Sequence, residues 1–264
     1  MSDFTKGTKD VVEQLYGAEI TKNFPNYGEF WIRFIGDPKK VIPLPYGLDF
    51  TNAVKGTNIT QVNQNYEELC MAHYSLFCHL SGAHFQQEIL KEILKLPDSS
   101  AKKFKHWEAF ETSYIHLGSV FYQMYHVWAL VFLMRGEVKR KKGRGNREYF
   151  DPSAKKKLEQ LLVSKGQKAI NDRKAKIDLS ITALRDSIVH FSRSASSYQN
   201  GEFLIPRQNK QVVWSKQDIK EAYEASGKLQ NDIAETEKII NDIHVYLIQQ
   251  YEDFLTANKM AVIK

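Results

Sequence analysis

Apolar residues recur at helical spacing over most of the chain from about Ile59 onward, and this periodicity constrains the fold more than any other feature. The clearest case lies near the C-terminus, where apolar side chains follow one another at intervals of three, four and seven residues. Such intervals place the side chains on one face of an α-helix. The apolar positions of that segment are Leu229, Ile233, Ile240, Ile243, Leu247, Tyr251 and Phe254.

Residues that favour turns and helix caps divide this region into segments of helical length. Ser81-Gly82 predicts a break within the first segment, and residues 164–166 interrupt a later one. Pro152 suits a first helical turn, and Ser215 with Asp218 resembles a capping box. The expected segments are 66–96, 104–134, 152–164, 168–195 and a last one after residue 215. We predict an all-α fold, a bundle of four to five long helices.

The first sixty residues differ from the rest, since they hold four of the seven prolines and an aromatic-rich run from Phe30 to Ile35. Gly36-Asp37-Pro38 predicts a turn, and residues 41–45 a second short extended run. Prolines confine such strands to the edge of a sheet. We predict a small N-terminal hairpin or extended arm over residues 1–60 and a helical bundle over residues 61–264.

The chain is basic, with a formal net charge of +6, and the positive charge is concentrated in its middle. Residues 101–180 contain 18 Lys and Arg against 8 Asp and Glu, whereas residues 216–257 contain 4 against 9. Solvated helix faces explain much of this pattern. The alternative is a polyanionic partner such as RNA.

The basic residues peak in a loop that separates two expected helices. Lys139, Arg140, Lys141 and Lys142 follow one another directly, and glycines lie on both sides of them. A flexible loop of this kind can follow an RNA backbone through charge alone. We therefore treat these four residues as candidate substrate-binding residues, with a solvated loop as the alternative.

Cysteine usage and the N-terminus bear on location. The only cysteines are Cys70 and Cys78, and no apolar leader opens the chain, which favours reduced thiols in a cytoplasmic protein. Residues 115–134 contain no charged side chain and are long enough to span a bilayer. His116 and His126 would be costly at bilayer depth. We therefore expect the central helix of a bundle and no membrane, with a transmembrane span as the alternative.

Several potential metal ligands occur close together in the first helical segment. They are Cys70, His73, Cys78, His79 and His84. Structural zinc sites usually use a pair of cysteines with two to four residues between them, or a pair of histidines with three to five residues between them. Here the cysteines are eight residues apart along one expected helix. We expect core packing for this group, as for His106, His116 and His126, and we expect no metal or other cofactor.

The most specific chemical pattern is Arg185, Asp186 and His190 within one expected helix. These groups supply a cation that can hold a phosphate, a carboxylate that can orient an imidazole, and an imidazole that can transfer a proton. Asp186 and His190 are four residues apart, so they share a helix face. The alternative without a catalytic role is that Arg185 and Asp186 form surface ion pairs with neighbours and that His190 lies at the rim of the bundle.

The spacing of Arg185 and His190 limits how they can act together. Five residues at 100° per residue place them about 140° apart around a straight helix. Both side chains can therefore reach one small site only if the helix distorts there or if a second copy of the chain completes the site.

The run from Leu184 to Phe191 resembles the signature motif of the HEPN superfamily, which is an arginine, a polar residue, a few further residues and a histidine. That superfamily consists of all-α bundles of about four or five helices, commonly dimeric, and many members are metal-independent endoribonucleases. The resemblance rests on this motif and on the helical layout of roughly residues 60–258. It does not extend to the first sixty residues.

The resemblance implies a ribonuclease whose catalytic residues are Arg185, Asp186 and His190, with Arg193 as a further phosphate contact. Its products would be a 2′,3′-cyclic phosphate and a 5′-hydroxyl end. It also implies a homodimer that acts on RNA in a defence, toxin or RNA-processing role, alongside an antitoxin or other defence-system protein. Because some HEPN members lack activity, a catalytically inactive binding or scaffold module is the alternative.

Overall fold

A computed structural model of the chain describes residues 48–49, 51–55, 58–97, 99–142, 148–150, 153–191, 197–199, 202–204 and 216–262. In some of these segments only the backbone is described, as for Asp186 and His190. The expected N-terminal arm falls almost wholly outside the described residues, so its structure stays a prediction.

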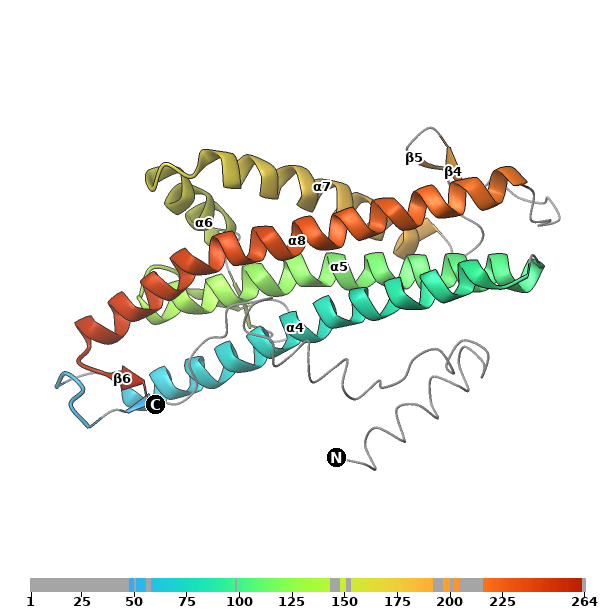
Figure 1. The fold of residues 1–264 in the computed structure, drawn as a ribbon. Helices are drawn as coiled ribbons and strands as arrows, with labels where there is room; N and C mark the ends of the chain where they lie inside the picture. The colour runs from blue at the N-terminus through green and yellow to red at the C-terminus, as the bar shows by residue number, and fades with distance from the viewer. Residues whose placement is uncertain are drawn as a thin grey trace, which may run out of the picture. The chain divides into compact units, whose positions relative to one another are not determined.

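Five helices account for nearly all of the described chain (Figure 1). They are α4 (Ile59–Lys95), α5 (Ser100–Met134), α6 (Ser153–Ser164), α7 (Lys168–Phe191) and α8 (Lys216–Ala257). This confirms the predicted all-α helical bundle. The seven apolar positions predicted for the last helix are all buried in the structure.

Within the described residues, the strands are two or three residues long and form three antiparallel pairs. The pairs are β1 (Leu48–Asp49) with β6 (Ala261–Val262), β2 (Arg140–Lys142) with β3 (Glu148–Phe150), and β4 (Ser197–Gln199) with β5 (Glu202–Leu204). The second pair lies at the base of the expected basic loop, which therefore is not irregular throughout.

The chain divides into two compact units, and the long helices contribute a segment to each. The described residues of the first unit lie within 79–118 and 177–236, and those of the second lie within 48–78, 119–176 and 237–262. Each has its own apolar core. Fully buried residues of the first unit include Leu80, Ile89, Tyr114, Leu117, Leu229 and Ile233; those of the second include Leu69, Leu76, Trp128, Ile240, Leu247 and Tyr251.

Side chains cap the starts of α4 and α5. The Asn58 Oδ1 atom accepts a hydrogen bond from the Gln61 amide at 3.1 Å, and Ser99 Oγ accepts one from the Lys102 amide at 3.1 Å. Each cap satisfies an amide that has no partner inside the helix. The Lys102 ammonium also donates to the Leu96 carbonyl oxygen at 2.7 Å, which closes the connection between α4 and α5.

Left-handed residues end three of the helices. Gly136 and Gly166, with φ of 72° and 73°, follow α5 and α6, and glycine adopts this conformation without a steric penalty. The sequence predicted the pause at Gly166. After α8 the same conformation falls on Lys259, with φ of 52°. Its neighbour Met260 donates a hydrogen bond from its amide to the Leu255 carbonyl oxygen at 2.9 Å.

The expected break at Ser81-Gly82 is wrong, because α4 continues through both residues. Gly82 serves packing instead. A Cβ atom built on it would lie 2.7–2.8 Å from three ring atoms of His116 in α5. The absence of a side chain at Gly82 therefore lets the imidazole lie directly against the α4 backbone.

Among the described helices, one segment is long and apolar enough to cross a membrane, namely Phe104–Met134 of α5. Within its most apolar window, 67% is buried in the structure. The core helix of a soluble protein meets the same test of length and composition, so this finding does not decide between the two interpretations.

Candidate functional site

The backbone that carries the Arg185–His190 motif is α-helical throughout. Helix α7 runs from Lys168 to Phe191 without interruption, and Ile181, one turn before Arg185, is fully buried. The described backbone of α7 therefore has no break between Arg185 and His190. On a regular helix Asp186 and His190 share a face, and Arg185 lies about 140° from His190.

Arg185 is fixed by a close contact with α5, at a glycine. A Cβ atom built on Gly118 would lie 3.1 Å from Arg185 Cγ and 3.2 Å from Arg185 Cβ, and closer still to Arg185 Cδ. Gly118 is buried, whereas Arg185 is half-buried. The aliphatic part of the arginine therefore fills the space of a missing side chain, and any larger residue at position 118 would displace it.

The remaining motif residues are only partly described. The side chains of Asp186 and His190 and the whole of Arg193 lie outside the described residues, so their roles stay predictions. Sequence reasoning missed Gly118. The signal was available in principle, since glycine in the middle of a 35-residue helix costs stability and calls for a packing reason.

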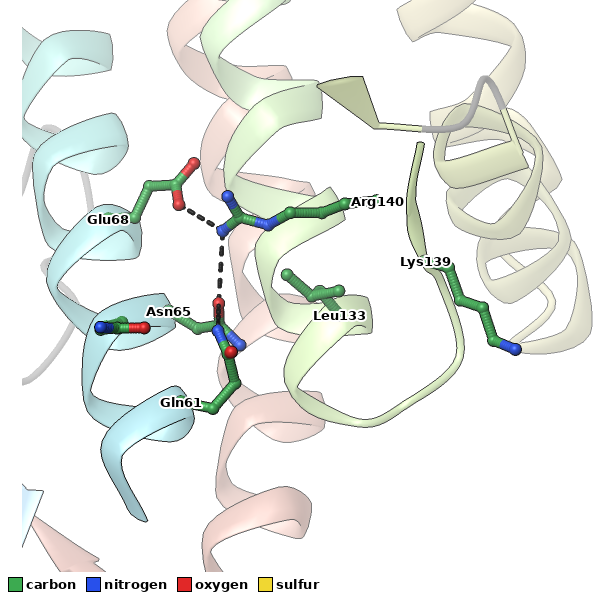
Figure 2. A pocket seen from close by; sticks show the side chains of 7 residues that line it. Gln61, Asn65, Glu68, Leu133, Lys139 and Arg140 are labelled. Atoms are coloured by element: carbon green, nitrogen blue, oxygen red, sulfur yellow. Dashed lines mark hydrogen bonds and ion pairs between the residues drawn. The ribbon is translucent and has the colours of Figure 1, made fainter. Parts of the chain in front are cut away.

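The basic residues of the predicted loop do not behave alike. Lys139 is exposed, whereas Arg140 is half-buried and reaches across from β2 to α4 (Figure 2). The side chains of Lys141 and Lys142 lie outside the described residues, although their backbone forms part of β2. Only Lys139 and Arg140 can therefore be placed relative to a site.

Arg140 is held by two side chains of α4. Its Nη2 atom donates to the Glu68 carboxylate in a short contact and to Asn65 Oδ1 at 3.3 Å. The other Glu68 oxygen lies 3.3 Å from His126 Nε2 of α5. Asn65 Oδ1 also accepts a hydrogen bond from Gln61 Nε2 at 3.1 Å. Arg140 therefore organises a polar cluster and is less available to a phosphate backbone than a solvated loop arginine would be.

This cluster forms one wall of a pocket of about 520 Å³ in the second unit (Figure 2). Its lining residues are Gln61, Gln64, Asn65, Glu68, Leu133, Lys139 and Arg140. Four of them come from α4 at positions 61, 64, 65 and 68, which is helical spacing for polar rather than apolar residues. These regularly spaced polar residues are a sequence signal from which the pocket could have been predicted. The predictions above used the periodicity of apolar residues only.

Two histidine pairs distinguish the interiors of the two units. In the first unit, His79 Nδ1 and His116 Nδ1 are 3.2 Å apart. Burial lowers the pKa of both, to about 4 for His116, whose pKa the neighbouring His79 lowers further. In the second unit, the ring centroids of the fully buried His73 and His244 are 5.5 Å apart. Burial lowers their pKa values to about 3 and about 4.

These pairs also explain why the residues considered as metal ligands do not converge. His73 contacts α8, whereas His79 contacts α5, so neighbouring histidines of α4 point in different directions. Within the described ranges, no group of three or more His, Cys, Asp or Glu residues could hold a metal ion. Both cysteines there are free thiols.

No protein-family model, no curated protein and no solved structure matches the chain.

Proposed function

We propose that the chain is a metal-independent endoribonuclease of the HEPN type, which cleaves RNA to 2′,3′-cyclic phosphate and 5′-hydroxyl ends. The observation that carries the proposal is the seating of Arg185 against Gly118, next to a helical Asp186–His190 pair. Because Gly118 has no side chain, Arg185 lies directly against the α5 backbone, which restricts its movement. Such restriction supports a phosphate-binding role, because electrostatic catalysis depends on groups that are fixed before the reaction.

In this mechanism Arg185 binds the scissile phosphate and stabilises the charge that builds up on it. A general base removes the proton of the ribose 2′-hydroxyl, and the 2′-oxygen attacks phosphorus. The bond from phosphorus to the 5′-oxygen breaks, and a general acid protonates the leaving oxygen. His190 serves in one or both of these proton transfers, and Asp186, one turn away, orients its imidazole.

The proposed enzyme is a homodimer. Because α7 is α-helical, Arg185 and His190 of one chain diverge, whereas a twofold axis can bring Arg185 of one copy close to His190 of the other. Each site is then built from both chains. Sedimentation of the purified chain should give twice the monomer mass of 30.6 kDa.

Cleavage of RNA in EDTA by the wild type and by matched variants tests the proposal. We expect His190→Ala to slow cleavage by about 10²–10⁴-fold, the usual contribution of a positioned acid or base. Gly118→Ala should slow it on the order of a hundredfold, because it moves Arg185 by about the width of a methyl group. Gly227→Ala is the control, since a Cβ there meets nothing within 4 Å.

Equal cleavage by the wild type and His190→Ala would contradict the mechanism. No cleavage by either protein, combined with retained RNA binding, would favour the alternative of a catalytically inactive HEPN-like binding or scaffold module. A defence-system or antitoxin partner would then be the protein to seek by co-purification.

A further inference from the structure

The pocket at the N-terminal part of α4 has the composition of a site for a polar, anionic ligand. Its volume of about 520 Å³ lies within the range of small-molecule sites. Its lining contains the carboxamides of Gln61, Gln64 and Asn65 but a single aliphatic side chain, Leu133. An apolar ligand would therefore gain little binding free energy in this pocket, whereas a ligand with several hydrogen-bonding groups would gain much more.

Asn65 is the residue that most clearly calls for a ligand. Its side chain is 5% exposed, and its Oδ1 atom accepts hydrogen bonds from Gln61 and Arg140. Its Nδ2 atom makes no hydrogen bond within the described part of the chain, although Asn65 lines the pocket. A carboxamide nitrogen carries two donors. No described residue uses these donors, so they are open to whatever occupies the pocket.

The geometry around Asn65 fixes which of its atoms faces the ligand. Arg140 and Gln61 both donate to Oδ1, so this atom must be the oxygen and the amide cannot turn over. Glu68 holds Arg140 through one carboxylate oxygen and contacts His126 through the other. The donor edge of Asn65 is thus set in place before any ligand arrives.

Charge at the rim selects an anion. Lys139 lines the pocket, is exposed, and in Figure 2 points away from the cluster around Glu68. Among the residues that line the pocket, Glu68 offsets the charge of Arg140, so the net charge that a ligand meets there is that of Lys139.

We propose that this pocket binds a nucleotide, with the carboxamides of Asn65 and Gln64 pairing with the edge of the base and Lys139 contacting the 5′-phosphate. The Gln64 carboxamide can match the adjacent donor and acceptor of a nucleobase edge, most directly that of adenine. Asn65, whose Oδ1 atom already accepts from Arg140 and Gln61, adds donors from Nδ2 only. The site lies wholly in the second unit and does not use Arg185 or His190, so the proposal stands apart from the ribonuclease mechanism. The same chemistry suits a free nucleotide and a nucleotide of an RNA strand.

Titration with adenosine 5′-monophosphate, adenosine and inorganic phosphate, followed by calorimetry, tests the proposal. We expect the monophosphate to bind. Gln64→Ala should weaken its binding about tenfold, since a bidentate contact with a base contributes about that much. Asn65→Asp should weaken its binding about fivefold, since it removes the donors of Nδ2. Asn65→Asp keeps the acceptor for Arg140 and Gln61 but removes the donors. Lys139→Ala should weaken the monophosphate and leave adenosine binding unchanged.

Matched variants control for charge and for folding. Gln230→Ala and Lys165→Ala remove an exposed carboxamide and an exposed ammonium elsewhere and should change nothing. Thermal melting checks that each variant is folded. A short unstructured RNA is then added as a competitor. If it displaces the monophosphate, the pocket binds a nucleotide of an RNA strand; if it does not, the pocket binds a free nucleotide.

Absence of monophosphate binding at millimolar concentration would overturn the proposal. So would affinity that Gln64→Ala and Asn65→Asp leave unchanged, or inorganic phosphate that binds as tightly as the nucleotide. RNA cleavage by the same preparations is measured separately. A failure to bind the nucleotide therefore leaves the proposed ribonuclease activity standing, and a failure to cleave RNA leaves the proposed nucleotide site standing.

Discussion

Acidification from pH 7 to pH 5 should destabilise the second unit through two buried histidines. His73 and His244 are fully buried, and burial lowers the pKa of the first to about 3 and of the second to about 4. His244 Nδ1 lies 2.8 Å from the Ile240 carbonyl oxygen, a contact that raises its pKa and only partly offsets burial. Neither His73 nitrogen has a hydrogen-bond partner in the described chain.

The magnitude follows from proton linkage. In the unfolded chain each imidazole titrates near its ordinary pKa of about 6.5, so below that pH the unfolded state binds a proton that the folded state does not. The stabilisation is complete above about pH 6.5 and is lost as the pH falls towards the folded pKa. Between pH 7 and pH 5 each histidine lowers the free energy of unfolding by about 1.9 kcal/mol, and the pair lowers it by about 4 kcal/mol.

Urea denaturation at pH 7, 6 and 5 measures this loss. His73→Leu removes one of the two titrating groups, so it should reduce the fall in the free energy of unfolding by about 2 kcal/mol. Phe77→Leu is the control, because Phe77 packs edge-on against His73 with ring centroids 4.6 Å apart. It should lower stability equally at every pH. A pH dependence that is identical in His73→Leu and the wild type would refute the reasoning.

Two further substitutions test the packing and the helix ends. Lys259→Gly should raise the free energy of unfolding by about 0.5–1 kcal/mol, because glycine adopts the left-handed conformation at the end of α8 without the strain of a side chain; a lower melting temperature would contradict this. Tyr114→Phe should lower the free energy of unfolding by about 1.5–3 kcal/mol, since the buried Tyr114 hydroxyl donates to Asp232 Oδ2 at 2.6 Å. Tyr122→Phe, at a side chain that is 67% exposed, should leave urea denaturation unchanged.

The helices could be predicted from the sequence because their signals are local. The period of the apolar residues from Leu229 to Phe254 identifies the buried face of α8 without reference to any other element. Gly166 likewise marks the end of α6 by its own conformational freedom. In both cases the physical cause lies within a few residues of the effect.

The site could be predicted only in part, because its remaining features depend on contacts between elements. From the sequence alone, Gly82 predicts a helix break, and only its contact with His116 shows that it serves packing. The role of Gly118 likewise follows only from its contact with Arg185. Arg140 reads as one more loop cation, although Glu68, 72 positions earlier in the chain, holds it. Sequence reasoning could name the chemical groups but not the residues that position them.

The contact between His79 and His116 has a consequence for the protons that the two rings carry. Two Nδ1 atoms 3.2 Å apart can share one hydrogen, so one ring donates and the other accepts. The donor ring then has a bare Nε2, whereas the acceptor ring carries its hydrogen there. The two imidazoles therefore form one tautomeric unit, in which any exchange of the shared hydrogen must reverse both rings together, and their nitrogen resonances should change in concert.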